Sequence, residues 1–282
     1  MPPKIPSIAV LDVGFFAHPD LDASRVLASR DATRLRVAPF LYGDPRAAAE
    51  HGTRTMLLAA GDGRASGLVS ASPEAPVVLL KVGHGKRAPR VAIARALRWL
   101  VRNARELALG VVLLPLGDDP DEPGEPPSPV PSLVEALDRK GIVVVAAAGW
   151  DPDGACVSPA SSPHVIAVAG YDLEKEAPFS GPRTEKIGGV LKPDLLAPGS
   201  PLPVPSLDGS PDRAMAGGAS FSAAFVAGLA HRLLLEHPEW KRPEILKALV
   251  SRARPIPGRP PYLPPDSLET MDLFAATVDV LV

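Results

Sequence analysis

Five aliphatic runs of strand length, separated by longer segments with helical periodicity, are the feature that most restricts how this chain can fold. The runs lie at 7–12, 76–82, 110–114, 142–147 and 165–169. Between them, 91–109 and 131–139 carry apolar residues three or four positions apart, the spacing of a helix with one buried face. Strands that alternate with helices in this way are typical of parallel βαβ units. We therefore expect an α/β fold, a three-layer αβα sandwich around a mostly parallel central sheet.

Length and composition fit one domain of this kind. The 282 residues, 46% of them hydrophobic, can bury one large core. We expect a single domain over 1–282, with the Pro-rich segment and C-terminal extension at 254–282 packed on it. A net charge of −2 and a pI close to 6.3 provide no basic surface for nucleic acid or an anionic membrane.

The cysteine content and the N-terminal segment bear on the compartment. The single cysteine, Cys156, excludes an internal disulfide. The sequence shows no charged-then-apolar leader and no run of about 18 apolar residues. We therefore expect a cytoplasmic protein with no nucleic-acid or membrane partner.

Three residues whose side chains can together carry out nucleophilic catalysis occur in the order Asp12, His51, Ser220. A serine hydroxyl is a poor nucleophile near neutral pH, so it needs a base and a carboxylate that orients the base and stabilises its cation. Asp12 ends an aliphatic run and is expected where a buried strand stops, which is where α/β sheets form their sites. His51 and Ser220 each precede a helical run, so the N–H of Ser220 and the helix dipole can face a developing oxyanion. This order indicates a serine hydrolase.

At these residues the chain resembles the subtilisin-like serine proteases, the subtilases of peptidase family S8. The similarity extends through HPDL at 18–21, GIVVVAAAG at 141–149, SPAS at 158–161, APG at 197–199 and VAG at 226–228, and covers roughly residues 7 to 253. It implies an endopeptidase with a polypeptide substrate. In that reaction Ser220 would attack the carbonyl, His51 would act as base and then acid, and Asp12 would orient and stabilise His51.

Three single positions and one four-residue segment depart from the family's usual pattern, although the three reacting groups are present. Trp150 stands where an Asn side chain usually donates to the oxyanion, and Ala219 stands where a Thr usually precedes the nucleophile. Val13 replaces the Ser or Thr after the aspartate, and PLGD at 115–118 replaces Ser-Leu-Gly-Gly. In subtilisin itself, loss of one oxyanion-hole donor costs about 10²–10³ in turnover. The atypical oxyanion hole therefore predicts a slow or narrowly specific enzyme.

The resemblance also indicates where the substrate would lie. An extended peptide is expected to pair through its main chain with the edge at 114–118 and the strand at 146–149. The expected substrate-binding residues are Leu116, Gly117, Asp118, Ala147, Ala148 and Gly149. The acidic residues at 118–122 allow two interpretations: a preference for Lys or Arg beside the cut, as in relatives resembling kexin and furin, or a solvated loop.

No cofactor and no metal site are expected. Asp20 resembles a position that binds calcium in some relatives, but the segment at 61–66 carries few ligand oxygens. The strand that carries Asp12 begins at residue 7, so either the protein folds without the prodomain common among relatives or the sequence is a trimmed form. The first alternative fits an intracellular enzyme. We therefore expect activity to be limited by substrate selectivity or by a regulatory or inhibitory protein partner.

Three functions are compatible with these residues. The first is the slow or narrowly specific endopeptidase, since removing auxiliary donors lowers the rate without erasing the mechanism. The second is a catalytically impaired pseudoprotease that binds a peptide or a partner in the cleft, with Trp150 filling the vacated space. The third is acyl transfer to an amine or alcohol acceptor. The intact Asp12, His51 and Ser220 favour the first.

Overall fold

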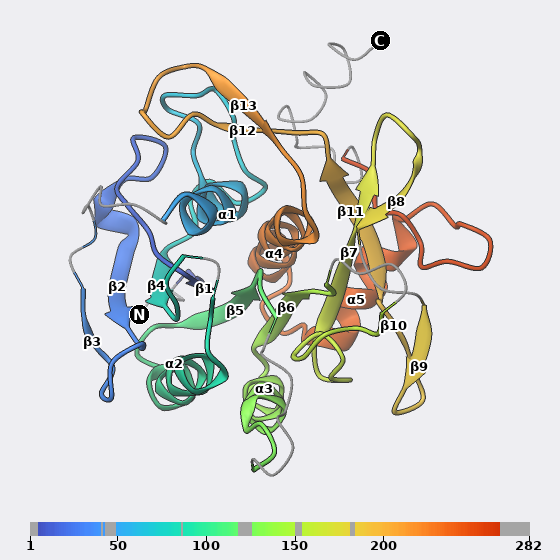
Figure 1. The fold of residues 1–282 in the computed structure, drawn as a ribbon, viewed down its shortest axis with the longest axis horizontal. Helices are drawn as coiled ribbons and strands as arrows, with labels where there is room; N and C mark the ends of the chain where they lie inside the picture. The colour runs from blue at the N-terminus through green and yellow to red at the C-terminus, as the bar shows by residue number, and fades with distance from the viewer. Residues whose placement is uncertain are drawn as a thin grey trace.

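A nine-stranded sheet organises the part of the chain that the computed structural model describes, namely residues 5–40, 42, 49–85, 87–117, 126–149, 154–180 and 184–265. Its strand order is β11, β7, β6, β5, β1, β4, β2, β3, with β8 paired to β7 (Figure 1). The strands are β1 (Ser7–Asp12), β2 (Val26–Asp31), β3 (Ala38–Pro39), β4 (Val77–Lys81), β5 (Leu109–Leu114), β6 (Val143–Ala147), β7 (Ile166–Asp172), β8 (Ala177–Ser180) and β11 (Leu195–Ser200). All neighbouring pairs are parallel except β2–β3 and β7–β8. The expected mostly parallel sheet is confirmed.

Helices cover both faces of this sheet. On one face, α1 (Glu50–Ala60), α4 (Ala219–Glu236) and α5 (Arg242–Ser251) share an apolar core with the strands. On the other face, α2 (Arg90–Asn103) and α3 (Val130–Arg139) share a second core. Figure 1 shows α1 and α4 on one side of the strands and α2 and α3 on the other. This is the three-layer αβα arrangement that the sequence predicts.

Smaller elements lie outside these layers. A short 3-10 helix, η1 (Ala23–Arg25), precedes β2. Two antiparallel hairpins stand apart from the main sheet and consist of β9 (Glu185–Ile187) with β10 (Val190–Lys192), and β12 (Leu202–Pro205) with β13 (Arg213–Ala216). No helix in the described ranges is long and apolar enough to cross a membrane.

The central strand β1 explains why the strands read as continuous aliphatic runs. Ile8 and Val10 belong to the core under α1 and α4, whereas Ala9 and Leu11 belong to the core under α2 and α3. All four are fully buried. A parallel strand covered on both faces buries both sets of alternating side chains, so its sequence shows no polar alternation.

One helix differs from the sequence pattern. The helix expected over 91–109 ends at Asn103, and the chain turns through 104–108, where Ala108 has a φ of 47°, before β5 begins. After α5, the described part of the Pro-rich tail lies against β11. There Leu196 donates to Pro261 at 2.9 Å and accepts from Leu263 at 2.8 Å, and Leu263 is fully buried.

The contact between α1 and α4 yields a prediction about stability. A Cβ atom at Gly228 of α4 would lie 2.8 Å from the carbonyl oxygen of Ala59 and 3.3 Å from Cβ of Ala71. Gly228→Val should therefore force the helices apart and lower the free energy of unfolding by about 1–3 kcal/mol. Denaturant unfolding followed by circular dichroism measures this loss. The same valine at exposed Lys247 of α5 is the control, and equal stability of the two variants would contradict the prediction.

Candidate active site

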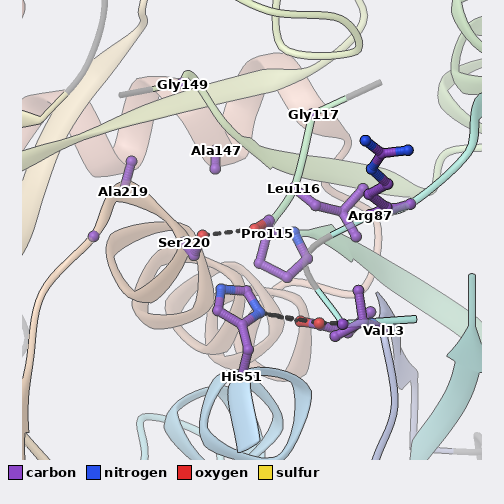
Figure 2. Close-up of a pocket in the computed structure, with 14 residues that line it drawn as sticks. Val13, His51, Arg87, Pro115, Leu116, Gly117, Ala147, Gly149, Ala219 and Ser220 are labelled. Atoms are coloured by element: carbon purple, nitrogen blue, oxygen red, sulfur yellow. Dashed lines mark hydrogen bonds and ion pairs between the residues drawn. The ribbon is translucent and has the colours of Figure 1, made fainter. Parts of the chain in front are cut away.

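Asp12, His51 and Ser220 come from three elements that meet at one end of the sheet. Asp12 is the last residue of β1, which lies between β4 and β5 at the centre of the sheet. His51 is in the first turn of α1, and Ser220 is in the first turn of α4. All three residues line one pocket (Figure 2). The fold thus brings together residues that are far apart in the sequence.

The carboxylate of Asp12 holds the imidazole of His51. Nδ1 of His51 lies 2.9 Å from Oδ2 and 3.0 Å from Oδ1 of Asp12. The Asp12 side chain is fully buried, whereas that of His51 is 40% exposed. A proton on Nδ1 therefore points at the carboxylate, which leaves Nε2 as the nitrogen that can exchange a proton in the pocket.

The same contact changes how readily His51 is protonated. Burial alone would lower the pKa of its imidazole, and the charge of Arg54 acts in the same direction. The charge of Asp12 and the hydrogen bond to it act in the opposite direction and outweigh them, so the pKa of His51 lies above its ordinary value. Asp12 thus stabilises the imidazolium that a proton transfer would create.

A glycine allows α1 to approach Asp12 this closely. A Cβ atom at Gly52 would lie 2.2 Å from the carbonyl oxygen of Gly14 and 2.8 Å from Cβ of Asp12. Neither distance is compatible with a side chain. The glycine after His51 is therefore required by the packing of the helix start on the end of β1.

The hydroxyl of Ser220 is held by the chain that leaves β5. Its Oγ donates to the carbonyl oxygen of Pro115 at 2.6 Å, and Figure 2 shows Ser220 above the His51 ring with this bond drawn. In the first turn of α4, the N–H groups of Phe221 and Ser222 donate to the carbonyl oxygen of Gly218 at 3.0 and 3.4 Å, and the N–H of Ser220 precedes them. The helix dipole adds positive character at this end. Ser220 therefore lies at an end of α4 that attracts negative charge, but its hydroxyl must turn before His51 can accept its proton.

The pocket around these residues has a volume of about 550 Å³. It is lined by Asp12, Val13, His51, Gly85, Arg87, Ala88, Pro115, Leu116, Gly117, Ala147, Gly149, Gly218, Ala219 and Ser220. The polar or charged residues of this lining are Asp12, His51, Arg87 and Ser220. The other lining residues are apolar or are glycines. Such a cleft can hold an extended peptide chain with small side chains near Ser220.

The family of the chain follows from comparison with known proteins. The family model described as "Subtilase family" matches residues 4–273. The chain belongs to the subtilases. The resemblance seen in its motifs is therefore confirmed.

Individual relatives support the assignment of this chain to the subtilase family. It is 28% identical over 253 residues to M-protease of Shouchella clausii (strain KSM-K16) and to Subtilisin Savinase of Lederbergia lenta, in each case over 87% of this chain. It is 30% identical over 277 residues, 86% of this chain, to Serine protease AprX of Bacillus subtilis (strain 168). It spans 58% of M-protease, 82% of Savinase and 60% of AprX. The solved structure of S41 Psychrophilic Protease matches with a TM-score of 0.74 at 26% identity, covering 88% of this chain and 83% of that one.

Most of the substrate-binding residues expected for this subtilase line the pocket, but one does not. Leu116, Gly117, Ala147 and Gly149 line it, as does Ala219. The side chain of Ala148 is instead fully buried in the core under α2 and α3, because neighbouring residues along an extended chain face opposite sides of the sheet. Asp118, the acidic run at 118–122 and Trp150 lie outside the described residues, so the sequence predictions about them stay predictions.

Three residues at the site were not anticipated from the sequence. The Thr55 hydroxyl lies 3.0 Å from Oδ2 of Asp12. Arg87 lines the far side of the pocket in Figure 2, after a tight turn. Val157 lies behind two lining glycines, since a Cβ atom at Gly117 or Gly149 would be 3.0 or 3.3 Å from its methyl carbons. The position of Thr55, one helical turn after His51, could have indicated in the sequence that its hydroxyl lies near the site. Nothing in the sequence marks Arg87 or Val157.

Asp20, the residue with a calcium-binding counterpart in some relatives, is engaged by hydrogen-bond donors. Its Oδ1 accepts from the backbone N–H groups of Ala65 at 2.6 Å and Ser66 at 3.1 Å, and its Oδ2 accepts from the Ser66 hydroxyl at 2.5 Å. Calcium needs oxygen ligands around it, whereas these neighbours present hydrogens. The surroundings of Asp20 do not fit a calcium ion, and the described ranges contain no group of three or more His, Cys, Asp or Glu residues that could hold a metal.

The opposing influences on His51 give a prediction about protonation. Asp12→Asn removes the charge that raises the pKa of His51 and leaves burial and Arg54, which both lower it. The pKa of His51 should therefore fall from above to below its ordinary value. An NMR titration of the His51 ring measures the change, with the other histidines in the same spectra as controls. A pKa unchanged by the substitution would show that Asp12 does not act on His51 as described.

Proposed function

We propose that this subtilase is a serine endopeptidase that hydrolyses peptide bonds through Ser220, His51 and Asp12. The observation that carries the proposal is the 2.9 Å contact between His51 Nδ1 and buried Asp12, in the pocket that Ser220 lines at the start of α4. These are the parts that activation of a serine requires: an oriented base, a charge that stabilises its cation, and an electropositive helix end for the oxyanion.

The proposed reaction follows from these positions. Ser220 Oγ turns from Pro115 toward Nε2 of His51, gives up its proton there, and forms a bond to the peptide carbonyl carbon. The negative charge that develops on the carbonyl oxygen faces the first N–H groups of α4. The His51 proton then passes to the leaving amine as the peptide C–N bond breaks and the acyl-enzyme forms. Water, deprotonated by His51, attacks the acyl carbon. The bond between Oγ and this carbon then breaks, the new carboxylic acid end of the peptide leaves, and His51 returns the proton to Ser220 Oγ.

The turning of Ser220 also frees an acceptor for the substrate. In the unbound protein the carbonyl oxygen of Pro115 is occupied by the Ser220 hydroxyl. A peptide N–H that binds this oxygen would displace the hydroxyl and leave it available to His51. Peptide binding along 115–117 would in this way favour the reactive orientation of Ser220.

Low or narrowly selective turnover is part of the proposal. Ala219 carries no hydroxyl and Trp150 carries no side-chain amide, so auxiliary oxyanion donors of the usual type are missing. The backbone donors of α4 would carry most of the stabilisation. A small apolar recess between Gly117 and Gly149, closed by Val157, would restrict the side chains accepted beside the cut.

A second function is favoured by one observation. The Ser220 hydroxyl donates to Pro115 in place of His51, which is the orientation expected of a cleft that binds a peptide or partner protein without cutting it. This pseudoprotease differs from the endopeptidase in one measurable property, the reactivity of Ser220.

Covalent labelling tests the endopeptidase directly. A fluorophosphonate probe should form an adduct at Ser220 of the wild-type protein. Only an activated serine displaces the fluoride of the probe fast enough for labelling to be detected. Ser220→Ala should abolish labelling, and His51→Ala should reduce it by at least about 10³-fold because the base is lost. Mass spectrometry of the labelled peptide locates the adduct.

The control is His237→Ala, which removes an exposed histidine outside the pocket and should leave labelling unchanged. Absence of an adduct at Ser220 would exclude the endopeptidase and leave the binding module. Labelling that His51→Ala does not change would also contradict the proposed mechanism.

We also propose that Asp20 and the segment at 65–66 bind no calcium ion. Its support is the set of three donors that satisfy Asp20 without a cation and tie it to Ala65 and Ser66. Chelation by EDTA should therefore leave the thermal unfolding midpoint unchanged, whereas Asp20→Asn should cost about 2 kcal/mol of stability by weakening charge-assisted hydrogen bonds. Calorimetry with EDTA and with added calcium measures both effects. A midpoint that rises with calcium would contradict this proposal.

A further inference from the structure

Thr55 contacts the carboxylate of Asp12 from the same helix that carries His51. Its Oγ1 lies 3.0 Å from Oδ2 of Asp12, and its side chain is fully buried. We propose that Thr55 is a positioning residue for catalysis, whose hydroxyl fixes the buried Asp12 carboxylate in the orientation that aligns His51. The inference rests on the proposed endopeptidase function and assigns a fourth side chain to its machinery.

The contacts of Asp12 show what Thr55 adds. Oδ1 accepts from the backbone N–H of Val13 at 2.7 Å and lies 3.0 Å from His51 Nδ1. Oδ2 lies 2.9 Å from His51 Nδ1 and 3.0 Å from the Thr55 hydroxyl. A fully buried carboxylate needs donors on both oxygens. Without Thr55, Oδ2 would depend on His51 alone among the described residues, and the carboxylate could rotate about its Cβ–Cγ bond.

The hydroxyl proton of Thr55 has two acceptors within reach. Oγ1 also lies 3.1 Å from the carbonyl oxygen of Gly52, three residues back in α1. A hydrogen bond to a charged carboxylate is roughly twice as strong as one to a neutral carbonyl. The proton therefore goes to the Asp12 carboxylate, and the restricted χ1 of the β-branched side chain keeps the hydroxyl in the rotamer that points there.

Helix geometry makes the pair of contacts from α1 rigid. Residues four apart lie on the same face of a helix, so His51 and Thr55 reach Asp12 from consecutive turns. The close packing at Gly52, between them in the sequence, holds this face against the end of β1. His51 and Thr55, from one helix, thus both contact the carboxylate, and a rotation of Asp12 would break both contacts.

Among the residues that the structure describes, few other charged groups lie near His51. Asp12 approaches from β1, Arg54 lies on α1 itself with Glu50 3.8 Å from its guanidinium, and Arg87 lines the pocket from the turn after β4. The residues of α4 that line the pocket carry no charge. The hydroxyl dipole of Thr55 partly neutralises the Asp12 charge that His51 experiences. Its loss should therefore strengthen the attraction of Asp12 for the His51 proton and raise the pKa of His51 further.

Labelling of the full chain by the fluorophosphonate probe at a series of pH values tests this inference. Thr55→Val keeps the shape and removes the hydroxyl, so labelling at pH 7 should slow roughly tenfold. The pH midpoint of the labelling rate should rise, and the NMR signal of the His51 Nδ1 proton should shift. Thr55→Ser restores the hydroxyl and should restore the wild-type midpoint and signal.

The matched control is Thr53→Val, which removes a buried hydroxyl of the same helix that donates to Ala49 at 2.7 Å and does not contact Asp12. It should leave the pH midpoint unchanged, whatever stability it costs. If Thr55→Val does not fold, Thr55→Ala removes the same hydroxyl with less bulk and decides the question.

The outcomes separate this inference from the proposed function. Failure of the wild type to react at Ser220 would overturn the endopeptidase, and this inference with it. A reactive wild type together with Thr55 variants of wild-type rate and midpoint would overturn the role of Thr55 alone. A Thr55→Ser protein that behaves like Thr55→Val would also overturn it, because the hydroxyl would then not be the active feature.

Discussion

The arrangement of the site depends on a negative charge that the fold buries at the end of its central strand. Asp12 is fully buried because β1 lies between β4 and β5 with helices over both faces. Such a charge is tolerated only where donors surround it. The donors come from the following residue and from α1, which must therefore pack closely on the strand end. That packing requires Gly52 and fixes the position of His51.

Much of the fold could be predicted from the sequence because the central strands are buried on both faces and therefore read as continuous aliphatic runs. Four strands of the main sheet could not be recognised this way, namely β2, β3, β8 and β11. β3 and β8 are short and pair in antiparallel fashion with one neighbour each. β2 is polar and partly exposed near one end of the sheet. β11 contains Pro198 and Gly199, which resemble a turn, but it lies at the end of the strand order, where a missing N–H is tolerated.

The meeting of Asp12, His51 and Ser220 in one pocket agrees with the sequence prediction, because each of the three has a distinctive local sequence. The contacts around them could not be predicted. Thr55 reads as an ordinary helical residue until the packing of α1 on β1 is known, since its role depends on a contact across 43 positions of sequence. The direction of the Ala148 side chain, which faces the core and not the pocket, could not be predicted either, because the side to which an extended residue points depends on register.

In the proposed reaction Ser220 becomes the nucleophile by turning from Pro115 to His51, with its oxyanion at the start of α4. A crystal structure of the protein after reaction with a peptidyl phosphonate would show whether this rotation occurs. We expect a covalent bond from Ser220 Oγ to phosphorus, a phosphoryl oxygen within hydrogen-bond distance of the Ser220 N–H, and Oγ released from Pro115. An unreacted inhibitor in the cleft, with Ser220 still bonded to Pro115, would contradict it.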